Sequence, residues 1–582
     1  MTKEIIEIYL IYESNLNYWK NTMLETHVLI VGAGPVGLMT ALLLSNQGVS
    51  SLVVDRRFER MTAPKAHAVN SRTLEICDAA GLDAETVRAA GAAADEAGWV
   101  RFLSKLNGVE FGHLPYERQQ DDVKDLTPYP LTNIAQPDFE ALLAETLQSR
   151  SDVTLLRGVE CDALIEKPEG VFADLLFRGS SAPVQAKAKY VIAADGANSR
   201  IRTALDIDLE GSEALQHNMM IHFEADLRPF VSDRSGILHF LFDPDCSGVL
   251  IAYDQETNWV LMHPFDPATT KADSFDKAAC EMLVERAVGA PVSNVTVKNA
   301  GAWVMCSQVA TAYRKDRIFL VGDAAHRFPP TGGLGLNTGI GDAQNIAWKI
   351  AAVENGWAAP TLLDSYEAER RPVARINSEQ SLENAGKLFE LFGALYGPAP
   401  TETRAHFDTI CANPSNSETL VPAVEMQRPH FDSLNLQLGY RYNSSAIADA
   451  APLVSSANLD ISTYVPSYEA GACFPHHWVT QDGVKKSILS RLSATGFTLV
   501  AGPEGQAWLE AAGKQGVPIS ALVMDEGFDD LQFDWAGQTG LPTKGALLLR
   551  PDAHIACRID HMPTDATTFL EEKIHHILGT AT

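Results

Sequence analysis

The chain has 582 residues, of which 46% are hydrophobic and 21% charged, an ordinary composition for a globular protein. Its formal net charge at pH 7 is −28. Nucleic acids and anionic membrane surfaces bind basic patches, so this charge argues against both as partners. The chain is too long for one hydrophobic core, and two or three domains are expected.

Cysteine usage and hydropathy indicate where the protein works. The eight cysteines include no C-x-x-C pair and no spacing typical of a zinc site. Such free thiols are typical of a reducing compartment, and we expect a cytoplasmic protein. No run of about 18 or more apolar residues occurs, so no membrane-spanning helix is expected. Glu7 interrupts the apolar run at 5–12, unlike a signal peptide, and residues 1–23 are interpreted as an N-terminal extension.

A glycine-rich turn is the first motif along the chain. The sequence Gly-Ala-Gly-Pro-Val-Gly at 32–37 follows a strand-like apolar run at 27–31 and opens a helical pattern. A second strand-like run at 51–54 ends in Asp55. This order of strand, glycine turn, helix, strand and acid is typical of a dinucleotide-binding unit. Its glycines let the backbone approach a pyrophosphate, and its acid binds a ribose.

Two further motifs follow strand-like runs. Residues 189–194 predict a strand that ends at Asp195-Gly196, and residues 317–321 predict one that leads into Gly322-Asp323. Between them, alternating apolar runs at 218–299 predict an antiparallel sheet. The chain therefore returns to the first sheet after a long excursion. Helices are expected at 136–149, 337–353 and 362–385.

In this order, the three motifs resemble those of the FAD-dependent aromatic hydroxylases, the single-component (class A) flavoprotein monooxygenases. The likeness is greatest to the branch of phenol hydroxylase and 2,4-dichlorophenol 6-monooxygenase. It extends to residues 64–75, 136–140 and 332–342, and to the C-terminal stretches 471–478 and 545–554.

The resemblance implies an α/β fold. A Rossmann-like FAD-binding domain would carry an inserted, mainly antiparallel β-sheet substrate domain and a C-terminal thioredoxin-like α/β domain. A homodimer is also expected. The implied ranges are 24–100 with 133–217 and 300–397 for the FAD-binding domain, 101–132 with 218–299 for the substrate domain, and 418–582 for the thioredoxin-like domain.

The resemblance further implies FAD as the cofactor and NADPH, or NADH, as co-substrate. No second G-x-G-x-x-G occurs, which argues against enzymes with two dinucleotide domains, and no metal motif such as H-E-x-x-H is present. The residues implied to bind FAD are Gly32, Gly34, Pro35, Val36, Gly37, Asp55, Arg56, Arg72, Gln136, Asp195, Gly196, Asp323, Pro330, Gly333, Gly335, Leu336 and Asn337.

In such enzymes a reduced flavin reacts with O₂, and the resulting flavin hydroperoxide attacks an electron-rich ring. The protein must supply a phenolate, a dry pocket and access for NADPH. His67 is the leading candidate for the base, because histidine exchanges protons near neutral pH. It stands where the phenol hydroxylase pattern has a carboxylate. A structural, hydrogen-bonded histidine beside the flavin is the alternative, and Tyr253 and His222 are further candidates.

The sequence thus predicts an FAD-dependent monooxygenase that hydroxylates a small phenolic substrate with NAD(P)H and O₂. One alternative is a hydroxylase of a larger, polyketide-like aromatic. Another is a flavoprotein that binds a partner or a prenyl chain without hydroxylation, which the motifs at Asp195 and at 326–330 argue against.

Overall fold

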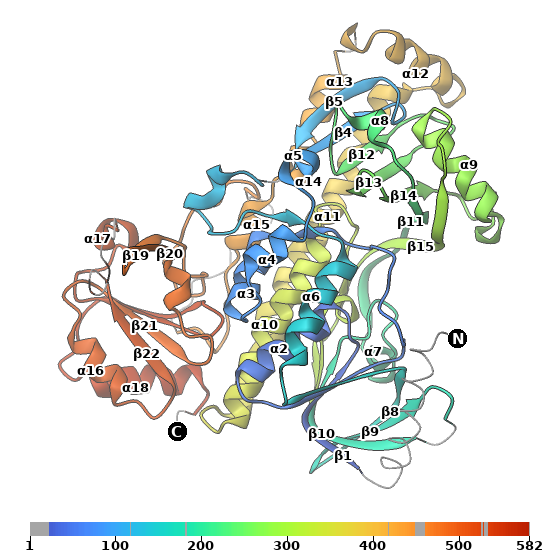
Figure 1. The fold of residues 1–582 in the computed structure, drawn as a ribbon. Coiled ribbons are helices and arrows are strands. Elements are labelled where there is room, and N and C mark those ends of the chain that lie inside the picture. The colour runs from blue at the N-terminus through green and yellow to red at the C-terminus, as the bar shows by residue number, and fades with distance from the viewer. Residues whose placement is uncertain are drawn as a thin grey trace.

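The structure is a computed structural model that describes residues 23–580 except 117, 181–182, 417, 449–459, 525, 527 and 529–532. The expected N-terminal extension, apart from Met23, lies outside the described residues. Two eight-stranded sheets and a smaller C-terminal sheet surround a central group of long helices (Figure 1).

The first sheet contains the glycine turn. Its strands run in the order β16-β17-β10-β1-β2-β7, and β9 and β8 extend it from β10. The strands are β1 (Leu24–Val31), β2 (Ser51–Asp55), β7 (Val153–Arg157), β8 (Val159–Lys167), β9 (Gly170–Phe177), β10 (Val184–Ala193), β16 (Arg314–Lys315) and β17 (Ile318–Leu320). The pairs β1–β2, β1–β10, β2–β7 and β10–β17 are parallel, so their carboxyl ends share one edge. Parallel strands are covered on both faces, and Val28, Leu29 and Ile30 are accordingly fully buried.

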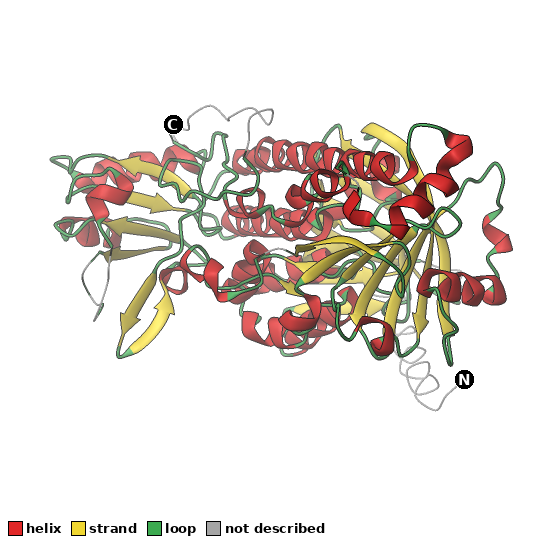
Figure 2. Ribbon diagram, turned by 90° about the horizontal axis from the view of Figure 1, so that it is seen from above, coloured by secondary structure: helices red, strands yellow, loops and turns green. Residues whose placement is uncertain are grey.

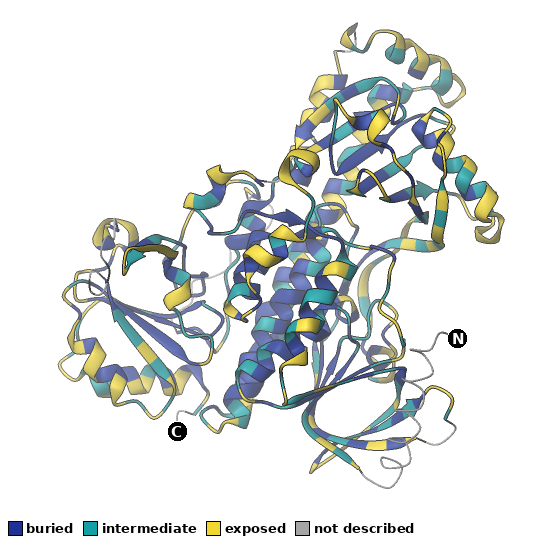
Figure 3. Cartoon of the chain, viewed as in Figure 1, coloured by how far each residue is buried: buried dark blue, intermediate teal, exposed yellow. Residues whose placement is uncertain are grey.

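Helices cover this sheet and form the centre of the molecule. They are α2 (Pro35–Asn46), α3 (Ser71–Ala79), α4 (Ala84–Ala89), α6 (Gln136–Gln148), α7 (Arg200–Ala204) and α10 (Leu334–Glu354). The helix α2 packs against both α6 and α10. The burial colouring shows α10 almost entirely buried, because other elements surround it (Figure 3).

The second sheet has the order β18-β15-β11-β14-β13-β12-β4-β5 and is antiparallel except at β12–β4. Its strands are β4 (Trp99–Leu103), β5 (Glu110–Pro115), β11 (Leu209–Glu224), β12 (Leu238–Leu241), β13 (Gly248–Asp254), β14 (Asn258–Pro264), β15 (Thr296–Ala310) and β18 (His326–Arg327). A short separate ladder joins β3 (Ala68–Val69) to β6 (Thr132–Asn133).

Each face of the second sheet packs against a different set of helices. These are α5 (Ala94–Ala97), α8 (Arg228–Val231), α9 (Lys277–Val288), α11 (Ser365–Tyr396), α12 (Thr403–Ala412), α13 (Leu420–Glu425) and α14 (Arg428–Phe431). The short helix α15 (Leu434–Leu438) packs on α3 instead. Residues alternate between the faces along each strand. Ile221 and Phe223 join the core under α9, whereas Phe240 joins the core under α11, α13 and α14.

The C-terminal part has a four-stranded sheet in the order β22-β21-β23-β24. Its elements are β19 (Trp478–Gln481), β20 (Val484–Ser487), β21 (Phe497–Ala501), α16 (Ala507–Gly513), β22 (Ile519–Val523), α17 (Trp535–Thr539), β23 (Ala546–Leu549), β24 (Ile555–Ile559) and α18 (Ala566–Ile577). The β21–β22 pair is parallel and the other two pairs are antiparallel, which is a thioredoxin-like order. Figure 2 shows this part at the opposite end of the central helices from the second sheet.

Buried charges join the C-terminal part to the centre. Glu369 on α11 accepts hydrogen bonds from Arg550 and Lys349, and Arg550 also pairs with Asp552. All four side chains are almost completely buried. Removing one partner would leave an uncompensated charge, so this cluster fixes how the two parts dock.

The predicted α/β fold with its inserted sheet and thioredoxin-like tail is confirmed. The division into residue ranges stays a prediction, but the strands cross its boundaries. β11 and β15 pair from Leu209 opposite Ala310 to Glu224 opposite Thr296, with register shifts after Ser212 and His222. Both strands therefore cross the predicted boundaries, β11 at 217/218 and β15 at 299/300. The helix α13 packs on β5, so residues 420–431 lie with the second sheet and not with the C-terminal sheet.

Candidate active site

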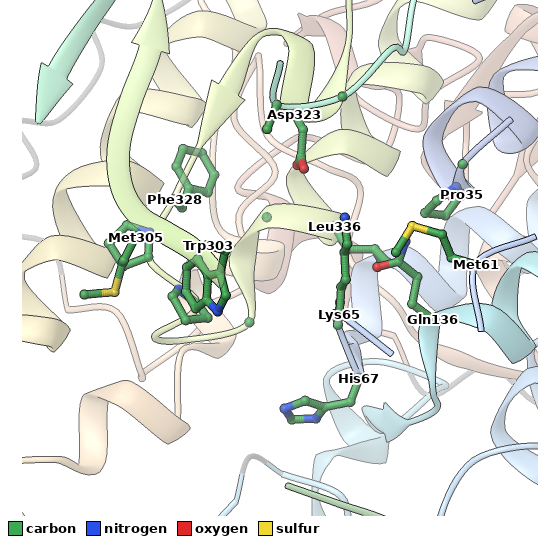
Figure 4. A pocket seen from close by; sticks show the side chains of 18 of the residues that line it. Pro35, Met61, Lys65, His67, Gln136, Trp303, Met305, Asp323, Phe328 and Leu336 are labelled. Atoms are coloured by element: carbon green, nitrogen blue, oxygen red, sulfur yellow. The ribbon is translucent and has the colours of Figure 1, made fainter. Parts of the chain in front are cut away.

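A cavity of about 890 Å³ lies between the first and second sheets. One wall comes from the carboxyl ends of β1, β2 and β10 and from the first turns of α2 and α10. The other comes from β12–β15, α11 and α14. Figure 4 shows Pro35 on one side of this space and Trp303, Met305 and Phe328 on the other. Ligands of open α/β sheets bind at this edge, outside the carboxyl ends of the strands.

The glycines of the first turn are required for two different physical reasons. A Cβ at Gly32 would lie 2.1 Å from the carbonyl oxygen of Ala194, and one at Gly37 would lie 2.0 Å from that of Gly32. Both positions therefore need glycine for the chain's own packing. Gly34 differs, because a Cβ there meets no protein atom within 4 Å and its φ is an ordinary −78°.

Gly34 and Gly335 thus leave open space that the protein does not use. Both line the cavity, and a Cβ at Gly335 would likewise meet no protein atom within 4 Å. Each lies at the start of a long helix, where free backbone N–H groups favour an anion. The cradle fits a pyrophosphate that approaches the backbone closely.

Asp55 connects the glycine turn to the second strand. Its Oδ2 accepts a hydrogen bond from the Ala33 backbone N–H at 2.9 Å, and its Oδ1 accepts one from Arg57 N–H at 2.8 Å. The carboxylate also lines the cavity. It therefore holds the turn in shape and still faces the place where a ribose would lie.

The two later motifs meet at the cavity as well. Asp195 follows β10, and its Oδ2 accepts a hydrogen bond from Ile201 N–H, while its Oδ1 is buried without a partner among the described residues. Arg202 donates to the carbonyl of Ala324 at 3.1 Å and so ties this motif to the one at Asp323. Asp323 itself points into the cavity (Figure 4).

His67 lies at the end of the cavity away from Asp323 (Figure 4). Its Nδ1 is 2.7 Å from Asn133 Oδ1, a carbonyl oxygen that can only accept, so Nδ1 carries the proton and Nε2 keeps its lone pair. Burial lowers the pKa of His67, and the Asn133 hydrogen bond opposes this only in part. The ring is therefore neutral at pH 7 and can accept a proton.

Most residues predicted to bind the cofactor line this one cavity. They are Gly32, Gly34, Pro35, Val36, Gly37, Asp55, Arg56, Gln136, Asp195, Gly196, Asp323, Pro330, Gly333, Gly335 and Leu336. They come from segments that are far apart in the sequence, and the strand order brings them together.

Two predicted cofactor contacts lie elsewhere. Arg72 pairs with Glu75 and donates to the backbone carbonyl of Asp552, so its guanidinium faces the C-terminal part. The Asn337 side chain accepts a hydrogen bond from Thr73 Oγ1 and donates to two backbone carbonyls, so it is not free to contact a cofactor. Both residues support the walls of the cavity without lining it.

The two other predicted catalytic candidates also lie outside the lining. Tyr253 packs edge-on against His67 with 6.1 Å between ring centroids, and burial raises the pKa of its phenol. The Nε2 of His222 is 3.0 Å from Asn258 Oδ1, at the far part of β11. Of the three, only His67 reaches the cavity.

The structure adds residues that no sequence motif indicated. Trp303 and Phe392 line the cavity from β15 and α11, and His430 lines it from α14. Each lies in an element without a recognisable motif. Trp303 belongs to the second sheet itself, whereas only the packing of α11 and α14 on this sheet places Phe392 and His430 here.

Neither a membrane segment nor a metal centre is found in the described part of the chain. None of its helices has the length and apolar character needed to cross a membrane. No group of three or more histidine, cysteine, aspartate or glutamate side chains within the described ranges is placed to hold a metal ion.

Comparisons with known proteins agree with this site. Residues 25–381 match the FAD binding domain family model, and residues 467–581 match that of the aromatic-ring hydroxylase C-terminal domain. The chain is 31% identical to tetracenomycin B2 monooxygenase-dioxygenase of Streptomyces olivaceus, over 96% of this chain and 99% of that protein. It is also 31% identical to 2,4-dichlorophenol 6-monooxygenase of Cupriavidus pinatubonensis, over 96% and 97%.

A solved structure is similar over the same length. The flavin-dependent monooxygenase PieE, in complex with FAD and substrate, superposes with a TM-score of 0.88 at 30% identity, covering 96% of this chain and all of that one. The cradle at Gly34 and Gly335 and the acids at Asp55 and Asp323 fit FAD. The chain therefore belongs to the FAD-dependent aromatic hydroxylases, the class A flavin monooxygenases.

Proposed function

We propose that this protein hydroxylates a phenolic ring with NAD(P)H and O₂, with NADPH as the expected donor. The observation that carries the proposal is a neutral His67 in the same cavity as the cofactor cradle. Bound FAD would take the reducing equivalents from NAD(P)H and use them to activate O₂. The chain's own residues must bind the ring, ionise its hydroxyl and keep water out.

His67 is proposed to ionise the phenol. Its Nδ1–H is held by Asn133, which leaves Nε2 as the acceptor for the substrate hydroxyl proton. Loss of that proton makes the ring electron-rich. Asn133 acts through His67, because it fixes which ring nitrogen carries hydrogen.

The apolar wall is proposed to keep water from the reacting ring. Phe240 and Phe242 of β12 and the turn after it, and Phe392 of α11, line this end of the cavity. Exclusion of water strengthens the electrostatic effects in the site and limits side reactions. Phenol-sized and larger aromatic rings both suit such a wall.

A larger, polycyclic aromatic is the second candidate substrate. The relative that acts on tetracenomycin B2 and the one that acts on 2,4-dichlorophenol are equally similar to this chain. The aromatic side chains of Phe240, Phe242 and Phe392 can pack against a polycyclic ring system as well as against a single ring.

A phenol panel tests the proposal. The purified holoenzyme is mixed with NADPH or NADH and single-ring or fused-ring phenols, and coenzyme oxidation and hydroxylated product are measured together. The proposal expects a product from at least one phenol, formed in proportion to NADPH. Flavin that is reduced and reoxidised without a hydroxylated product from any phenol would make this a non-hydroxylating flavoprotein.

A further inference from the structure

One polar side chain in the apolar wall of the cavity has no role in the proposed reaction. His430 on α14 is 4% exposed and lines the cavity. Its Nδ1 is buried and has no hydrogen-bond partner among the described residues. A buried polar atom without a partner costs free energy, so its presence in the wall calls for a ligand group.

The surroundings of His430 make this position distinctive. The residues of β12, α11 and α14 that line the cavity are otherwise apolar: Leu238, Phe240, Leu241, Leu382, Ala385, Gly386, Leu388, Phe389 and Phe392. Burial lowers the pKa of His430 to about 3, so the ring is neutral. A neutral imidazole has one donor and one acceptor nitrogen and therefore suits a hydroxyl or a carbonyl.

His430 packs against aromatic neighbours. Its ring stacks on Phe431 with 4.2 Å between centroids and meets Phe240 edge-on at 6.1 Å. Phe431 contacts Tyr116, and Tyr116 contacts His67. Tyr116 and Phe431 are buried behind the lining, and the rings of His67 and His430 are related only through them, so we expect a ligand that touches both imidazoles to be longer than a single ring.

We propose that His430 determines substrate specificity by hydrogen-bonding a second polar group of the substrate, remote from the hydroxyl that His67 ionises. The preferred substrate is then an aromatic of two or more fused rings with a hydroxyl or carbonyl on the far ring. This inference rests on the proposed function for the location of the reacting ring, and it adds the feature by which the cavity selects its substrate.

Two probes of matched shape test the inference. The first is 2,6-dihydroxynaphthalene and the second is 6-methyl-2-naphthol, in which a methyl group replaces the far hydroxyl. Binding to the FAD-loaded protein is followed by the change in flavin absorbance, so the measurement does not need turnover. We expect the wild-type protein to bind the diol about tenfold or more tightly than the methyl compound.

The decisive variant is His430→Phe, which keeps the ring that stacks on Phe431. It should bring the ratio of the two affinities close to one by weakening the diol. His430→Gln keeps a polar atom and should retain part of the preference. His239→Phe is the matched control, because His239 is also a buried histidine, but it lies outside the lining of the cavity. It should leave the ratio unchanged.

The inference is overturned if wild type binds the two probes equally or binds neither, or if His430→Phe keeps the wild-type ratio. It is also overturned if Trp303→Phe removes the preference and His430→Phe does not, because Trp303 Nε1 is the other buried and unpartnered side-chain atom of the second-sheet wall among the described residues. Product formation from single-ring phenols is scored separately. If the naphthol binding test fails while single-ring phenols are hydroxylated, the inference is refuted and the proposed function stands. If the expected affinity ratio is found but no phenol is hydroxylated, the proposed function is refuted and the inference stands.

Discussion

The Nδ1 nitrogen of His67 lies 2.7 Å from the Oδ1 oxygen of Asn133. The β3–β6 ladder sets this distance, because it pairs Ala68 with Asn133 and so places the two side chains next to each other. The contact decides which nitrogen of His67 faces the cavity as a proton acceptor, and several expectations depend on it.

His67→Ala should retain FAD but lose roughly two to four orders of magnitude in hydroxylation, the range for a positioned general base. The loss should shrink for more acidic phenols, which enter the site already ionised. Product formed per NADPH is measured across phenols of graded acidity. An equal loss for all of them, or no loss, would make His67 a structural residue and redirect the search to Tyr253.

Asn133→Asp should shift the pH profile of hydroxylation. In the wild-type protein burial lowers the pKa of His67 below 6.5, so activity should be full above that value and fall as the pH drops through the lowered pKa. A carboxylate on Nδ1 favours the imidazolium and raises this pKa. The acidic limb of kcat/KM should therefore move to higher pH, while a superimposable profile would separate Asn133 from proton transfer.

Gly34→Val should abolish FAD binding without unfolding the protein. The backbone at Gly34 is compatible with any residue and a Cβ there meets no protein atom, so only a bound pyrophosphate would be displaced. Flavin absorbance of the purified variant measures occupancy. Gly513→Val is the matched control, since its Cβ also meets no protein atom but lies in α16 of the C-terminal part. Normal flavin content in Gly34→Val would mean that the cradle holds another group.

Asp323→Ala should weaken FAD without abolishing it. The carboxylate lines the cavity and is expected to accept a hydrogen bond from the cofactor, worth roughly 1.5–3 kcal/mol for a charged group. The dissociation constant should rise about 10- to 150-fold by equilibrium titration of the apoprotein with FAD. An unchanged constant would mean that the cofactor does not contact Asp323.

The sequence predicted the fold class and most of the cavity lining, since each glycine or acid motif follows a strand whose direction the pattern reveals. It did not separate residues that touch the cavity from those that support it. Arg72 and Asn337 belong to the same motifs as lining residues, yet their side chains turn toward Asp552 and Thr73. Only the three-dimensional register distinguishes the two kinds.

The residues that line the proposed substrate-binding end of the cavity could not be predicted from the sequence, for a different reason. Its wall is built by α11 and α14 packing on β12, and such tertiary contacts leave no local pattern in the residues that make them. His430 is one histidine in a short helix, and the residue spacing gave no sign that it reaches the cavity. The sequence-based boundary at residue 418 assigned it to the C-terminal domain.

Flavin reduction should depend on the substrate. We expect the flavin to exchange between a buried position and one that NADPH can reach. NADPH should therefore reduce the flavin slowly in the resting enzyme, and a suitable phenol should accelerate reduction by favouring the second position. Stopped-flow absorbance with and without each phenol measures both rates. If no productive phenol changes the rate of flavin reduction, the substrate does not control this step, although hydroxylation itself would still be possible.

The origin of the oxygen atom in the product tests the central claim most directly. The holoenzyme is supplied with NADPH, a phenol that is turned over and ¹⁸O₂ in ordinary water, and the product is analysed by mass spectrometry. A class A monooxygenase reaction predicts one ¹⁸O atom in each newly formed hydroxyl group. A hydroxylated product without ¹⁸O, or oxidised NADPH with peroxide as the sole oxygen product for every phenol, would contradict the account.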